Sequence, residues 1–107
     1  MPKYLIQANY SAEGLKGLMK DKASGRKAAL DTALGALGGT LESLYYTFGE
    51  FDVIVIADVP DNVSAAALSL AASASGLVRT RTTPLLTIEE TDQALKKSVK
   101  YRAPGKK

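Results

Sequence analysis

A run of five aliphatic residues, Val53 to Ala57, constrains the fold of this chain more than any other feature. The run is rich in β-branched residues and lies between two turn-forming segments, Gly49-Glu50 and Asp58-Val59-Pro60. A short apolar run bounded in this way is typical of a strand that is buried on both faces. We therefore predict a strand in the middle of a sheet, with the rest of the chain arranged around it.

The segments on either side of this strand predict the order β-α-β-β-α-β, followed by a last helix. Expected strands cover residues 3–10, 40–48, 51–58 and 77–86, and expected helices cover residues 11–37, 60–76 and 88–100. The first helix should be interrupted at residues 21–25, where the apolar periodicity is lost. The second is expected to bury Val63, Ala67, Leu70, Ala71 and Ala74.

Right-handed crossovers then give an α+β fold of the ferredoxin-like kind, βαββαβ with a C-terminal helix. Its four-stranded antiparallel sheet has the first and third strands at the centre and two helices on one face. Pro84 cannot donate a hydrogen bond to a ladder, so the last strand belongs at an edge.

The central strand is apolar on both sides, and two helices on one face of the sheet can cover only one of them. Val53, Val55 and Ala57 point to one side of the strand. Ile54 and Ile56 point to the other. An uncovered apolar face usually marks an interaction surface. The simplest partner to cover it is a second copy of the same chain. We expect a homodimer or higher oligomer that pairs through this sheet face, with a cavity between the subunits.

Composition limits the available chemistry. The chain has 107 residues, enough for one domain, and contains no cysteine and no histidine. This excludes disulfides and thiolate metal sites, and it removes the commonest general base. The carboxylates show no calcium-loop spacing, so we expect no metal and no cofactor. No apolar stretch is long enough to span a bilayer or to form a signal peptide, so we expect a cytoplasmic protein without a membrane partner.

Positive charge is concentrated at the C-terminus. From Lys96 onward there are six basic residues and no acidic ones, whereas the preceding part carries a net charge of −3. Such a tail could contact nucleic acid. The body, however, has no basic patch and no aromatic, glycine-rich motif of the RNA-binding type. We interpret the tail as frayed or extended in solvent, and we do not expect a nucleic-acid partner.

Several short motifs resemble the GYD domain family. They are Gly49-Glu50-Phe51-Asp52, Ser24-Gly25-Arg26, Gly38-Gly39, Pro60-Asp61, and Gly76 followed by Val78-Arg79-Thr80. In the first, the Gly and Asp of the family's Gly-Tyr-Asp motif are kept, an extra residue follows the glycine, and phenylalanine replaces tyrosine. The resemblance implies a ferredoxin-like, dimeric α+β barrel and implies no established activity. We place this domain at residues 1–95 and the basic tail at residues 96–107.

Three groups of polar residues are candidates for a site. Asp52 begins the buried strand, where a carboxylate at an apolar mouth could act as an acid or base; alternatively, it closes the hairpin turn. Arg79 and Arg81 share a strand face and could hold a carboxylate or phosphate, with Asn9 and Tyr45 as neighbours. Alternatively, these arginines discourage edge pairing.

The third group is Ser24 and Arg26, which could bind an anion if Ser24 caps a new helix start. Alternatively, this segment is only a kink with a charged, solvated face. Tyrosines could also line a ligand pocket or pack in a dimer interface: Tyr4, Tyr10, Tyr45 and Tyr46.

The sequence does not carry a catalytic signature. The leading hypothesis is a homo-oligomeric module for binding a small anionic molecule or for assembly. The alternative is a small cofactor-free enzyme of the monooxygenase, isomerase or cyclase kind, using Asp52 or a tyrosine in the inter-subunit cavity. That alternative rests on fold analogy, and a fold does not determine a function.

Overall fold

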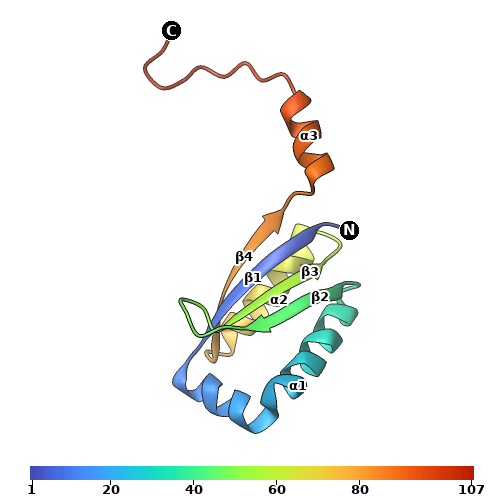
Figure 1. The fold of residues 1–107 in the computed structure, drawn as a ribbon, viewed down its shortest axis with the longest axis vertical. Coiled ribbons are helices and arrows are strands. Elements are labelled where there is room, and N and C mark those ends of the chain that lie inside the picture. Colours follow the sequence, from blue (N-terminus) through green and yellow to red (C-terminus); the bar gives the residue numbers. More distant parts are fainter.

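A computed structural model of residues 1–107 shows seven elements in the order β-α-β-β-α-β-α (Figure 1). The strands are β1 (Lys3–Tyr10), β2 (Thr40–Tyr46), β3 (Val53–Asp58) and β4 (Val78–Leu85). The helices are α1 (Ala12–Ala36), α2 (Asn62–Ala74) and α3 (Ile88–Lys96). This arrangement confirms the predicted α+β ferredoxin-like fold. None of the three helices combines the length and the apolar character needed to cross a membrane.

The four strands form one antiparallel sheet in the order β2-β3-β1-β4. The apolar run of the sequence is β3, which lies beside β1 at the centre, as predicted. β4 is an edge strand, which explains how Pro84 is tolerated within it. Between Leu41 and Ser43 a bulge interrupts the pairing of β2 with β3, so that Glu42 has no partner in the ladder.

The core lies between the sheet and the helices α1 and α2. Val53, Val55 and Ala57 are buried on this side of β3. Nine buried hydrophobic residues make up the core: Tyr4, Ile6, Ala8, Leu34, Val53, Val55, Ala57, Val59 and Ala65. The opposite side of the sheet, which we call the open face, has neither helix packed on it. α3 and the tail project beyond the end of the sheet (Figure 1).

Helix α1 begins at a side-chain cap and bends once. The Ser11 hydroxyl oxygen accepts the backbone N–H of Gly14 at 3.1 Å. The predicted interruption is present, at Lys22, whose φ of 64° is non-helical. Because residue 23 is already helical again, Ser24 lies inside the helix. The expectation that Ser24 caps a new helix was therefore wrong.

The predicted buried face of α2 was also wrong. Val63 and Leu70 are 80% and 70% exposed. The face toward the sheet contains Ala65, which is buried, with Leu68, Ser69 and Ala72 partly buried beside it. Alanine occurs on every side of this helix, so the sequence offers little contrast between one apolar stripe and the next.

Candidate functional site

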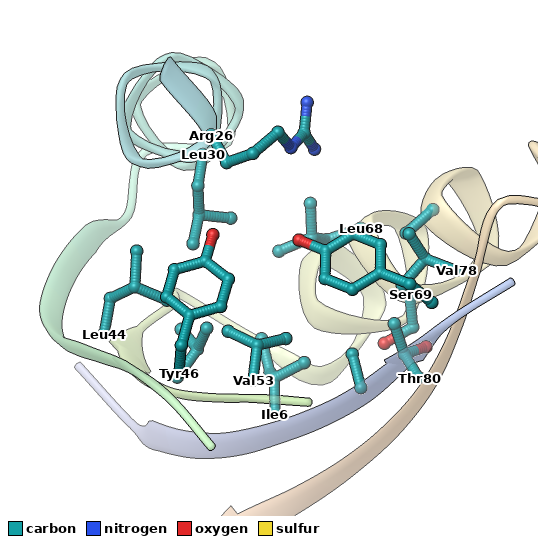
Figure 2. Close-up of a pocket in the computed structure, with 14 residues that line it drawn as sticks. Ile6, Arg26, Leu30, Leu44, Tyr46, Val53, Leu68, Ser69, Val78 and Thr80 are labelled. Carbon is teal, nitrogen blue, oxygen red and sulfur yellow. The ribbon is translucent and has the colours of Figure 1, made fainter. Parts of the chain in front are cut away.

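An apolar cleft lies between α1 and α2 (Figure 2). Ile6, Val53 and Val55 form its floor on the central strands, and Leu30 of α1 and Leu68 of α2 form its walls. Eleven of its fourteen lining residues are hydrophobic. Its volume is about 110 Å³, whereas about 10–15 Å³ on the same scale admits one water. The cleft therefore has room for a small organic molecule.

The cleft exists because the two helices pack on opposite halves of the sheet. α1 contacts mainly β2, and α2 contacts mainly β4. The strip above β1 and β3 is left between them, and small side chains at Ala8 and Ala72 widen it. An unfilled apolar gap in a core costs dispersion contacts. A gap of this size is consequently a place where a ligand would gain them.

Three polar side chains at the cleft can engage a ligand. Tyr10, Arg26 and Tyr46 line it, and Figure 2 shows the Tyr46 hydroxyl pointing from the sheet toward the helices. The hydroxyls of two other lining residues are already hydrogen-bonded, Ser69 to Thr82 and Thr80 to Ser73.

Arg26 retains most of its capacity to bind an anion. Its Nη1 lies 3.7 Å from Asp21 Oδ2, and both side chains are at least 40% exposed. An exposed ion pair at that distance contributes little stability. A ligand carboxylate could therefore replace Asp21 as its partner at small cost.

The environment of Tyr46 favours the neutral phenol. Burial, together with the smaller effect of the neighbouring Tyr10 hydroxyl, raises the pKa of Tyr46 to about 12, and Arg26 opposes this shift. Because the folded state keeps the proton longer than the unfolded state, stability should be unaffected below about pH 10 and should fall between about pH 10 and 12. Titration of phenolate absorbance should show one tyrosine ionising last, and Tyr46→Phe should remove that step. A Tyr46→Phe titration that keeps the late step would contradict this assignment.

Asp52 lies outside the cleft and has a structural role. Its Oδ2 accepts the backbone N–H of Tyr10 at 2.8 Å. Its own N–H donates to the carbonyl of Ala8 at 2.9 Å, and its carbonyl accepts the N–H of Thr47 at 2.8 Å. Asp52 thus ties the hairpin between β2 and β3 to the end of β1. These contacts are those of the turn-closing alternative, and nothing in them places the carboxylate toward a substrate.

Asn9, Tyr45, Arg79 and Arg81 lie on the open face, away from the cleft. Asn9 pairs with Arg79, and Gln7 pairs with Arg81. Tyr45 lies in the same cross-strand row as Arg81, but at the other end of it, about 14 Å away across three strand spacings. Arg81 lies over the Phe51 ring, 5.7 Å from its centroid. The structure brings Asn9 and the two arginines together and leaves Tyr45 apart; a ligand role for them stays a prediction.

The structure separates the two residues of the third candidate group, Ser24 and Arg26. Arg26 reaches the cleft, whereas Ser24 is exposed and does not line it. The aliphatic walls of the cleft, Leu30 and Leu68, were not identified from the sequence. In a sequence, an apolar helix residue that lines a cleft cannot be distinguished from one that packs in the core. It included Tyr10 and Tyr46 only within a larger set of tyrosines. The alternation of side chains along a strand places Tyr45 and Tyr46 on opposite faces, but it does not indicate which face carries the cleft.

Comparison with known proteins agrees with the sequence motifs. Residues 4–95 match the model of the GYD domain family. This segment runs from the second residue of β1 nearly to the end of α3. No curated protein and no solved structure matches the chain. Because the matched segment includes almost the whole fold, the chain belongs to the GYD domain family.

Proposed function

We propose that this protein is a binding module for a small organic anion, held in the cleft between α1 and α2. The observation that carries the proposal is the combination of an apolar hollow with one guanidinium and two phenol hydroxyls, from Arg26, Tyr10 and Tyr46. Ligand sites are commonly apolar with a few convergent polar groups. No other hollow in the structure combines these features to the same degree.

The lining suggests the chemistry of the ligand. An apolar body would contact Ile6, Val53 and Leu68, and one carboxylate would lie at Arg26, where a guanidinium can donate two parallel hydrogen bonds. The cleft offers one cation, so a single negative charge matches it better than a di- or triphosphate. The small volume favours a monocyclic aromatic or short aliphatic carboxylate.

We further propose that copies of the chain pair through the open face. Leu5, Ile54 and Ile56 form an apolar centre on this face, and no element of the same chain covers them. A second copy placed face to face would bury them and would complete an α+β barrel. The cleft lies on the opposite side of the sheet, so pairing would leave it accessible.

Binding can be tested by calorimetry with benzoate and hexanoate, using benzamide and hexanamide as uncharged controls. We expect the carboxylates to bind more tightly than the amides. Arg26→Gln should weaken carboxylate binding by about 10–100-fold, since a hydrogen bond to a charged group contributes about 1.5–3 kcal/mol. Leu68→Trp should block all four compounds by filling the cleft. Lys27→Gln is the matched control, because Lys27 lies next to Arg26 on α1 but pairs with Asp31 outside the cleft.

Two results would overturn the location of this site. One is an absence of binding by every carboxylate. The other is binding that survives Arg26→Gln and Leu68→Trp but is lost in Arg81→Ala. That second pattern would place the ligand on the open face, between subunits, where the sequence led us to expect it.

A further inference from the structure

The C-terminal arm, residues 86–107, leaves the domain without packing on it. α3 is nevertheless a well-formed helix: Thr87 and Glu90 exchange hydrogen bonds in a capping box at its start. Its large apolar side chains and those around it are 65–81% exposed, namely Leu86, Ile88, Leu95, Val99 and Tyr101. A capped amphipathic helix flanked by exposed apolar residues has the properties of an element that packs on another surface.

The arm begins beside the open face. It follows β4, whose last residue, Leu85, pairs with Lys3 on β1. The same chain therefore presents an uncovered helix and an uncovered sheet face in direct continuity. If copies pair face to face, each arm starts at the rim of the interface and can extend over the partner.

The charges of the first turns of α3 and of the open face are complementary, whereas the arm from Lys96 onward is basic. Arg79 and Arg81 form no ion pair within the chain, and neither do Glu89 and Asp92 of α3. The other cation of the face, Lys3, is satisfied within its own copy, by Glu42 at 2.6 Å and Asp58 at 2.9 Å. The two unpaired cations of the face are therefore opposite in charge to Glu89 and Asp92, while Glu90, the third acid of α3, is held in the capping box.

The area of the open face also leaves a role for the arm. Four strands with a longest length of eight residues give a footprint on the order of 500 Å², from a spacing of ~4.8 Å and a rise of ~3.3 Å. A specific interface commonly buries about 800 Å² on each partner. An arm with five exposed apolar side chains adds contact area beyond this flat footprint of the sheet.

We propose that the two copies of a dimer exchange their C-terminal arms, with α3 of each lying against the partner's open-face rim at β4. Glu89 and Asp92 then pair with Arg79 and Arg81 of the other copy, and the apolar side chains of the arm are buried across the interface. This rests on the proposed pairing of open faces. It is independent of ligand binding in the cleft, which lies on the other side of the sheet.

Charge reversal with mixing tests the exchange. The face variant carries Arg79→Glu and Arg81→Glu, and the arm variant carries Glu89→Lys and Asp92→Lys. In either homodimer both arms meet a face of like charge, so we expect dimerisation to weaken about 10-fold or more by sedimentation. In a mixed dimer of the two variants both contacts again have opposite charges. Mixing equal amounts should therefore restore dimerisation. The control variant combines Lys27→Glu with Asp31→Lys, which inverts an exposed α1 ion pair and should leave dimerisation unchanged.

Each outcome is decisive. Restoration on mixing supports exchange between copies. No restoration overturns it, and this is the result expected if each arm folded back onto its own face, because charge repulsion within each copy would persist. Dimerisation that is insensitive to both variants overturns arm exchange while leaving face pairing intact. A wild-type chain that stays monomeric overturns pairing and exchange together. Circular dichroism on each variant verifies folding. We expect it to be unchanged, because all four substituted side chains are exposed.

Discussion

Leu34→Ala is expected to lower the free energy of unfolding by about 2–5 kcal/mol. Leu34 is fully buried, at 0% exposure, and is the largest such side chain of α1. It belongs to the core cluster with Val55 and Ala57. Removing it deletes buried methyl groups and leaves a cavity between α1 and the sheet, which the surrounding packing closes only in part. Urea denaturation followed by circular dichroism would measure the change.

Leu70→Ala is the matched control for this prediction. Leu70 was expected from the sequence to be buried, but it is 70% exposed on α2. The same substitution there should change stability by no more than about 0.5 kcal/mol. If Leu70→Ala were as destabilising as Leu34→Ala, the rotation of α2 about its axis described above would be wrong, and with it the lining of the cleft by Leu68.

The success of the sequence analysis on the fold has a physical explanation. Val53 to Ala57 could only be a central strand, because five consecutive aliphatic residues need cover on both sides. Gly49, Asp61 and Gly76 mark the turns and caps around it. These local signals agree with one another, and their agreement is what specifies the topology.

The same reasoning failed where local signals are weak. α2 contains nine alanines and serines that fit either face, so its rotation is set by packing against β4 and not by its pattern. The cleft depends on how far apart α1 and α2 lie, which is a property of the packed structure. Arg26 was selected as an anion ligand for its place near the helix break, whereas it reaches the cleft because of the direction α1 takes after Lys22.

Asp52 gains a clearer meaning from its contacts. It belongs to the segment that resembles the family's naming motif, and the sequence made it the best candidate for an acid or base. Its carboxylate instead accepts the Tyr10 amide, and Tyr10 lines the cleft. The motif therefore connects the β2–β3 hairpin to the end of β1 at which the cleft begins. Its influence on function would be exerted through the position of Tyr10.

Gly14→Ala is expected to destabilise the protein by about 3 kcal/mol, toward the upper end of the effects of overpacking. A Cβ at this position would lie 2.1 Å from the carbonyl oxygen of Leu77. That oxygen is part of the main chain and is held in place, since it accepts the Ser11 N–H at 2.9 Å. To relieve this clash, the start of α1 would have to move away from β4, which would break this hydrogen bond and disturb the Ser11 cap.

Gly17→Ala provides a control of opposite sign in the same helix. A Cβ there has no atom within 4 Å, so the higher helix propensity of alanine should stabilise the protein by up to about 1 kcal/mol. Both variants can be compared by urea denaturation. Equal effects would mean that α1 is not seated on Leu77. Opposite effects would establish that α1 and β4 are in close contact where each begins. This contact fixes the end of the cleft where Tyr10 and Val78 lie. A substitution at Gly14 should therefore weaken carboxylate binding even under conditions where the variant remains folded.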